Sequence, residues 1–176
     1  MIVLMAGLPG TGKSTLAREL ARRTGGRVLS KDEFRHAIFP PEDIEYSTAQ
    51  DDFCHELMLE TAGYLLQRDS AKIIFLDGRT FSRRYQIENV LAVAASLHQP
   101  WKILECVCAE EIVRQRLAAT AGAQEHPAGN RDHELYLRVM DRFEGITLPK
   151  IVIDTDRPLA EYVERAIAAV QAGPTS

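Results

Sequence analysis

The sequence predicts an α/β protein with three layers, in which helices cover both faces of a five-stranded parallel sheet. Short apolar runs rich in β-branched residues alternate with longer amphipathic stretches, which is the pattern of parallel βα units. The short runs are continuous rather than alternating, as in residues 151–153, because strands of a parallel sheet are buried on both faces. The expected strands span residues 2–6, 27–30, 72–76, 102–108 and 150–154.

Helices are expected between these strands, where apolar residues recur at a spacing of four. The sets that show this spacing are Leu16/Leu20, Phe53/Leu57, Val113/Leu117 and Leu135/Val139/Phe143, and a last helix is expected near 158–171. Two segments break the pattern: residues 37–47 predict a loop beside the substrate region, and residues 120–131 an irregular connection. Because no repeat or composition break marks a boundary, residues 1–176 are expected to form one domain.

Composition and charge narrow the class of protein. Of the 176 residues, 45% are hydrophobic and 26% charged, and the formal net charge is −4. A negative net charge does not attract nucleic acid or an anionic membrane to the protein as a whole, so any such contact has to be made by a local basic region. Three cysteines cannot close a disulfide framework, and no uncharged run approaches the roughly 18 residues of a membrane span. We therefore expect a soluble protein of the cytoplasm without a membrane partner.

The segment Gly7-Leu8-Pro9-Gly10-Thr11-Gly12-Lys13-Ser14 fits the phosphate-binding pattern G-x-x-x-x-G-K-[ST], the P-loop or Walker A motif. It follows the first expected strand and opens the first expected helix, as that motif requires. Backbone N–H groups of such a turn, together with the positive end of the helix, bind di- or triphosphate oxygens. A glycine-rich turn without a ligand is the alternative, but the strand-loop-helix context favours a nucleotide.

The side chains of this loop are expected to bind ATP and Mg²⁺. Lys13 would place a positive charge between the β and γ phosphates, and the Ser14 hydroxyl would ligate Mg²⁺. The residues expected to bind the nucleotide are Gly7, Pro9, Gly10, Thr11, Gly12, Lys13, Ser14 and Thr15. Such a loop occurs in kinases, GTPases, switches and ATP-driven machines alike, so the activity has to be predicted from residues elsewhere in the chain.

After the second strand, Asp32 and Arg35 lie three residues apart and would share one face of a helix. In a kinase, Asp32 would accept the proton of the acceptor hydroxyl, and Arg35 would hold an anionic or polar part of the acceptor. A structural explanation is also open, because Ser30 and Glu33 form a capping-box pattern and an acidic first turn complements the helix dipole.

Asp77 ends the third strand, at the sheet edge where ligands of α/β folds collect. We expect it to hold Mg²⁺ through water or to shape the acceptor pocket, although Asp77-Gly78 is also common turn chemistry. Arg79 follows at the same edge and is expected to contact the acceptor. Arg83 and Arg84 are more typical of a solvated surface.

Residues 114–131 are expected to form a lid over the phosphates. Arg114 and Arg116 lie on a helix that leads into the irregular segment, and Arg131 lies at its far end. Lid arginines stabilise charge on the transferred group and help to exclude water. Residues two apart on a helix face different directions, so we expect Arg116 to reach the phosphates with Arg131 as its partner. An ordinary exposed helical face is the alternative.

With these residues, the chain resembles the small P-loop kinases grouped with AAA-domain predicted kinases, which are also similar to the kinase domain of phage-type 5′-hydroxyl polynucleotide kinases. The motifs that carry the resemblance are the 7–15 loop, Asp32-x-x-Arg35, Asp77, Arg114-x-Arg116, Glu134-Leu135-Tyr136, Arg142-Phe143-Glu144 and the final residues 151–155. The resemblance implies strand order 2-3-1-4-5, a short lid, Asp32 as general base, Arg35 at the acceptor and lid arginines at the phosphates. The chain departs from the polynucleotide kinases at Thr120, where they carry another arginine, and at residues 77–80, where they read Asp-Thr-Asn.

These features favour an ATP- and Mg²⁺-dependent kinase that transfers the γ-phosphoryl group to a hydroxyl of a small molecule. A polynucleotide 5′-kinase is the alternative enzyme, supported by the basic group Arg79, Arg83 and Arg84 and opposed by the acidic total charge. An ATP-binding switch that transfers nothing is the alternative from another class, but it would need neither a base nor a lid.

Overall fold

The computed structural model describes residues 1–120 and 133–172. Five parallel strands form one sheet in the order β2-β3-β1-β4-β5, which confirms the expected α/β fold and the strand order that the resemblance implied. The strands are β1 (Ile2–Ala6), β2 (Arg27–Ser30), β3 (Ile74–Asp77), β4 (Trp101–Val107) and β5 (Ile151–Asp154). Each end lies within two residues of its predicted position.

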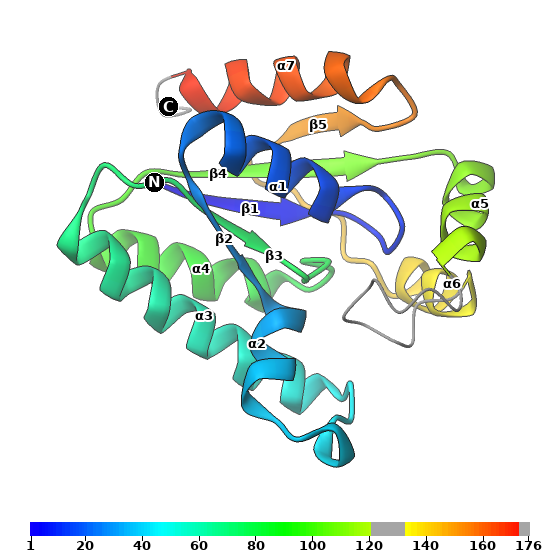
Figure 1. The fold of residues 1–176 in the computed structure, drawn as a ribbon, viewed down its shortest axis with the longest axis horizontal. Helices are drawn as coiled ribbons and strands as arrows, with labels where there is room; N and C mark the ends of the chain where they lie inside the picture. The colour runs from blue at the N-terminus through cyan, green and yellow to red at the C-terminus, as the bar shows by residue number, and fades with distance from the viewer. Residues whose placement is uncertain (121–132, 173–176) are drawn as a thin grey trace.

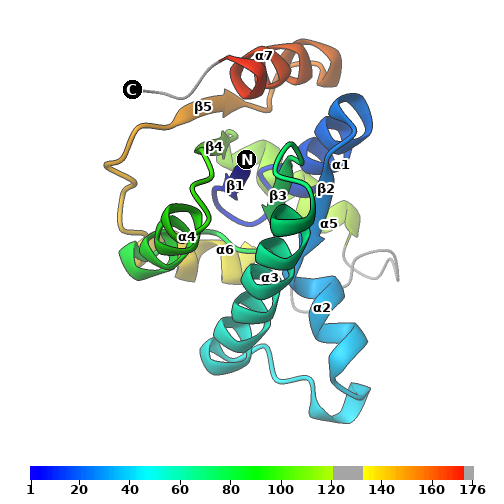
Figure 2. The same ribbon diagram turned by 90° about the vertical axis from the view of Figure 1, so that its left-hand side faces the viewer.

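Helices cover both faces of this sheet, as the continuous apolar strands predicted. Figures 1 and 2 show α1 (Lys13–Thr24) and α7 (Leu159–Gln171) on one face, and α3 (Thr48–Arg68) and α4 (Arg84–Ser96) on the other. The central strand β1 is buried along its whole length. Its Val3 and Met5 pack in the α1/α7 core, whereas Ile2 and Leu4 pack in the α3/α4 core.

The remaining helices gather where the strands end. These are α2 (Lys31–Ile38), the short 3₁₀ helix η1 (Pro41–Asp43), α5 (Glu110–Thr120) and α6 (His133–Asp141) (Figure 1). Because β3 lies between β1 and β2, the segments that follow these three strands meet at one edge of the sheet. Residues 7–14, 30–35 and 77–80 are therefore neighbours in space although they are far apart in sequence.

The helix predicted from the spacing of Phe53 and Leu57 is confirmed as α3, but its buried face is a neighbouring one: Phe53 is 46% exposed, whereas Cys54 and Met58 are fully buried. Helix α4 was not among the helices named from the sequence, although Ile87, Val90 and Leu91 form an apolar face that packs in the core. Among the described residues, no helix has both the length and the apolar character to cross a membrane.

Candidate functional site

The loop between β1 and α1 has the backbone of an anion-binding nest. Gly7 has φ +127°, and a Cβ there would lie 2.3 Å from the carbonyl oxygen of Cys106, so only glycine fits. Gly12 begins α1 in the left-handed conformation, with φ +80°, and no side chain caps this end of the helix. The first N–H groups of α1 are therefore available to an anion, as the motif predicts.

Lys13 lies within this nest. Its side chain is buried, and its Nζ donates a hydrogen bond to the carbonyl oxygen of Leu8 at 2.7 Å. The Thr11 hydroxyl donates to the same oxygen, also at 2.7 Å. Ser14 is partly exposed in the first turn of α1. The structure thus brings an ammonium group and a hydroxyl to the helix end at which the motif places a Mg²⁺-nucleotide.

Asp77 supplies a carboxylate beside this loop. It ends β3, the strand next to β1, and its buried Oδ1 has no hydrogen-bond partner in the described part of the chain. Burial raises the pKa of the nearby Cys106 thiol to about 12, an effect that Lys13 opposes and Asp77 strengthens. Lys13 and Asp77 thus act on the pKa of the same buried thiol with opposite sign.

The residues at this position fit Mg²⁺ bound together with phosphates. Within residues 1–120 and 133–172, no group of three or more His, Cys, Asp or Glu side chains could hold a metal ion alone. Mg²⁺ needs no such group, because it keeps several waters and is commonly bound by one or two protein oxygens plus phosphates. Ser14 and Asp77 are the residues that would hold it, through a hydroxyl and a carboxylate oxygen.

Arg116 approaches the loop from α5. Its guanidinium donates to the Thr155 hydroxyl at 3.1 Å and to the Thr155 carbonyl at 2.8 Å. Thr155 in turn donates to the carbonyl oxygen of Thr11 in the nest at 3.0 Å. Arg114, by contrast, is exposed and pairs with Glu111 on the same helix. The geometry therefore agrees with the expectation that only Arg116 faces the loop, whereas Arg131 lies outside the described residues.

On the other side of the loop, Asp32 is held by basic residues. Arg35 donates from Nη1 to Asp32 Oδ1 at 2.7 Å, and Lys31 Nζ lies 3.9 Å from the same oxygen. Arg35 is fully buried and also pairs with Asp51 at the start of α3 and with Gln50, 3.1 Å from its Nε. Asp32 and Arg35 thus lie on one face of α2, as their spacing predicted, and the contacts of Arg35 with Asp51 and Gln50 tie α2 to α3.

The capping interpretation of the same segment is correct for the Ser30 cap, whereas the Glu33 side chain pairs with Arg18 and does not complete a capping box. The Ser30 side chain accepts a hydrogen bond from the Glu33 backbone N–H at the start of α2. Glu33 points away from the Asp32 network and lies 3.7 Å from Arg18 in an exposed pair. The cap therefore orients the first turn of α2, and this leaves Asp32 on the inner face.

Gly78 lets the segment after β3 pass close to Asp32. Its φ is +86°, and an added Cβ would lie 3.0 Å from both the backbone N and the Cβ of Lys31 and 3.3 Å from the backbone N of Asp32. The adjacent strands pair Ser30 with Asp77 in register. Asp32 and Asp77, 45 positions apart in the sequence, are thus brought to neighbouring turns of one sheet edge.

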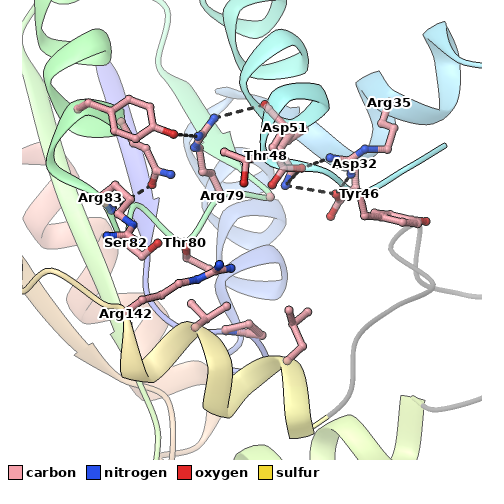
Figure 3. A pocket seen from close by; sticks show the side chains of 17 residues that line it. Asp32, Arg35, Tyr46, Thr48, Asp51, Arg79, Thr80, Ser82, Arg83 and Arg142 are labelled. Carbon is pink, nitrogen blue, oxygen red and sulfur yellow. Dashed lines mark hydrogen bonds and ion pairs between the residues drawn. The ribbon is translucent and has the colours of Figure 1, made fainter. Parts of the chain in front are cut away.

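A cavity of about 300 Å³ opens beside this edge. Figure 3 shows its walls, which come from the P-loop, α2, the start of α3, the 78–86 segment and α6. Asp32 and Arg35 line one side, and Arg79 and Thr80 line another. The cavity reaches the P-loop at Pro9. The predicted acceptor residues Asp32, Arg35 and Arg79 therefore surround one volume next to the phosphate nest.

Sequence reasoning gave no role to two charged residues of this cavity, although Arg142 stands in one of the motifs that carry the resemblance. Asp51 completes the ion pairs of Lys31 and Arg35, at 2.7 Å from Lys31 Nζ. Arg142, at the end of α6, extends into the cavity from the opposite wall (Figure 3). Arg83, predicted as part of a solvated surface, is half-buried, pairs with Glu144 at 3.1 Å and lines the cavity. Packing of α3 and α6 brings these side chains to the cavity, and no local spacing indicates this position.

This arrangement, a glycine-rich lysine loop at the end of the central strand of a five-stranded parallel sheet, defines a P-loop nucleotide-binding protein. The family model AAA_33, described as an AAA domain, matches residues 2–146. The chain belongs to this family. The matched region contains the loop, Asp32, Asp77 and Arg116.

Relatives and solved structures extend the comparison. The chain is 30% identical over 131 residues to the uncharacterized protein Rv2004c of Mycobacterium tuberculosis, covering 69% of this chain and 26% of that protein. Among solved structures, a Chloroflexus aurantiacus protein, provisionally named a kinase, superposes with TM-score 0.76 at 20% identity, covering 99% and 98% of the two chains. The M. tuberculosis APS kinase CysC, in complex with AMPPNP and APS, gives TM-score 0.70 at 20% identity with 97% coverage of both chains. Kti12 of Chaetomium thermophilum, in complex with ADP-AlF3, gives 0.70 at 15% identity and full coverage.

Proposed function

We propose that the protein is a kinase that transfers the γ-phosphoryl group of ATP, bound with Mg²⁺, to a hydroxyl of a small molecule. The observation that carries this proposal is that Asp32 lines a separate cavity that reaches the phosphate loop at Pro9. A protein that only binds nucleotide needs the loop but not a second cavity with a fixed carboxylate. The volume of about 300 Å³ suits a metabolite-sized acceptor.

In the proposed reaction, the oxygen of the acceptor hydroxyl attacks the γ-phosphorus, and its proton passes to the Asp32 carboxylate. The bond from the γ-phosphorus to the oxygen that bridges to the β-phosphate breaks, and ADP leaves. Arg35 and Lys31 hold Asp32 in place, which favours transfer because misplacement of a reacting group is costly. Lys13 would neutralise phosphate charge, and Mg²⁺, when bound by Ser14 and Asp77, would supply further neutralisation.

The arginines have separate proposed roles. Arg116, held by Thr155 beside the loop, would contact the nucleotide, and Arg131 stays a predicted partner of Arg116. Arg35 has no exposed surface, which supports a role in positioning Asp32, while its expected contact with the acceptor stays a prediction. Arg79 lines the acceptor cavity and would contact the acceptor.

The test is transfer of label from γ-labelled ATP to fractionated cell metabolites. Asp32→Asn keeps the size of the side chain and removes the base, so we expect unchanged ATP binding and transfer lowered by roughly 10²–10⁴-fold. Glu33→Gln is the matched control, because it makes the same chemical change one residue away on the exposed face of α2. Transfer that is as fast in Asp32→Asn as in the control would exclude Asp32 as the base.

Polynucleotide 5′-kinase activity is the second candidate, and the arginine-rich cavity wall favours it. An oligonucleotide with a free 5′ hydroxyl belongs in the same labelling experiment. Strand binding that depends on several phosphate contacts would weaken steeply with salt. Absence of oligonucleotide binding at low ionic strength would exclude this activity. A switch, in contrast, would bind ATP and label neither class of acceptor.

A further inference from the structure

The cavity beside Asp32 carries an excess of positive charge. Its charged lining residues are the basic Lys31, Arg35, Arg79, Arg83 and Arg142 and the acidic Asp32 and Asp51. The two carboxylates are engaged by Lys31 and Arg35, so these four side chains balance one another. Of the other three basic residues, Arg79 pairs with Asp52 and Arg83 with Glu144, which do not line the cavity, and Arg142 has no carboxylate partner in the described part of the chain.

Arg142 is the most available of these three. It is exposed, and its side chain extends from the end of α6 into the cavity, toward the segment after β3 (Figure 3). Neither a hydrogen bond nor an ion pair engages it within the part of the chain that the structure describes. Arg83, by comparison, is already paired with Glu144. A guanidinium group placed in a concave site in this way is suited to a carboxylate or a phosphate.

Arg79, which pairs with Asp52, provides a second, independent sign of a ligand that accepts hydrogen bonds. Its side chain is 4% exposed and is fixed through Nη1 to the Asp51 carbonyl at 3.3 Å and through Nη2 to Asp52 and Tyr85. Its Nε, however, is buried and lacks a hydrogen-bond partner among the described residues. A buried donor without a partner is costly, so a ligand that accepts from it would be stabilised.

We infer that the acceptor carries an anionic group, either a phosphate ester or a carboxylate, and that Arg142 and Arg79 bind this group in the cavity. The inference rests on the proposed kinase function, whose acceptor site it specifies. The uncharged lining supports it, because the hydroxyl groups of Tyr46, Thr48 and Ser82 suit a polar molecule better than an apolar one. The acceptor class is therefore a small anionic alcohol.

Direct binding tests the anion site without turnover. The protein is saturated with Mg²⁺ and AMPPNP, which fills the γ-phosphate position, and is then titrated with inorganic phosphate or with acetate in a calorimeter. We expect one anion per chain, and Arg142→Ala should weaken its affinity about tenfold or more, because a charge-assisted hydrogen bond is lost. Arg142→Lys should retain part of it. Arg138→Ala is the matched control, since Arg138 lies on the same helix but pairs with Glu134 in an exposed position.

The inference is wrong if neither anion binds to the wild-type protein, or if Arg142→Ala binds as tightly as Arg138→Ala. Labelling with γ-labelled ATP then separates this inference from the proposed function. Acceptor activity in the metabolite fraction retained by an anion-exchange resin supports both, and acceptor activity only in the unretained fraction overturns the inference while the kinase stands. If no fraction takes up label, the proposed kinase function is contradicted, and the anion site is then judged by the titration alone.

Phosphatase treatment of the retained fraction before the assay distinguishes the two kinds of anionic acceptor. A phosphate ester loses its acceptor activity, whereas a carboxylate keeps it.

Discussion

A buried histidine makes the stability of this protein depend on pH. His55 on α3 is 2% exposed, and neither ring nitrogen has a hydrogen-bond partner in the described ranges. Burial, strengthened by the charges of Arg79 and Lys31 and opposed by Asp52, lowers the pKa of His55 from 6.5 to about 3. Below pH 6.5 the unfolded chain therefore takes up a proton that the folded chain does not, so stability is complete above pH 6.5 and is lost as the pH falls toward 3.

The magnitude follows from the two pKa values. Between pH 8 and pH 5 the contribution of His55 to the free energy of unfolding falls by about 2 kcal/mol. His55→Leu removes the titrating ring and keeps an apolar contact for Phe81, whose ring centroid lies 5.7 Å from that of His55. From pH 8 to pH 5, the free energy of unfolding of the wild type should therefore fall by about 2 kcal/mol more than that of His55→Leu.

Urea unfolding followed by circular dichroism at pH 8, 7, 6 and 5, at constant ionic strength, measures this difference. Carboxylates and the other histidines contribute to both proteins and cancel in the comparison. His36→Leu is the control, because His36 is exposed and loses little water on folding. A difference between His55→Leu and the wild type that stays constant from pH 8 to pH 5 would refute the burial argument.

Three further predictions concern the site itself. Lys13→Ala should weaken ATP binding about tenfold or more, measured by titration with a fluorescent ATP analogue. Lys72→Ala, at a half-buried lysine that pairs with Asp69, should bind normally, and equal affinities of the two variants would contradict the phosphate nest. Gly78→Ala should cost about 1–3 kcal/mol in urea unfolding, because of the positive φ and the 3.0 Å approach to α2, and should slow transfer. Gly145→Ala, where an added Cβ meets nothing within 4 Å, should leave both unchanged, and a Gly78→Ala variant as stable as this control would show that the close approach carries no strain. Arg116→Ala should raise the Kd for ATP about tenfold, and an unchanged Kd would remove Arg116 from the nucleotide site.

The parts of the site that the sequence predicted are those encoded over short distances. The P-loop depends on glycines and a lysine within eight positions, and the Asp32–Arg35 pair depends on a three-residue helical spacing. Both are local, so the sequence alone specifies their geometry once the strands are identified. Asp77 was found for a related reason, because it ends an apolar strand whose carboxyl end lies at the ligand-binding edge.

The residues that the sequence did not predict depend on packing between distant elements. Helix α3 carries apolar residues on more than one face, so the pair Phe53 and Leu57 competed with the set that contains Cys54 and Met58, and only the position of the sheet decides which face is buried. The direction of the Asp51 side chain depends on which face of α3 is buried, because Asp51 lies one turn before the first core residue of this helix. Arg142 stands in a motif of the resemblance, but its place in the cavity depends on where α6 docks, and periodicity contains no such information.

Pairing between strands fixes the positions of the residues proposed to carry out the transfer, whereas the residue proposed to recognise the acceptor is held by a helix. The P-loop and Asp77 follow β1 and β3, which are hydrogen-bonded neighbours, so the distance between them is fixed by backbone pairing. Asp32 follows β2 and is fixed in the same way through the pairing of Ser30 with Asp77. Arg142 is different, because it reaches the cavity from α6, which belongs to neither of the two sheet-facing helix layers. A change at Arg142 should therefore alter which acceptor is bound without moving the residues that carry out the transfer, and this is the split between KM and kcat expected of a residue that only recognises the acceptor.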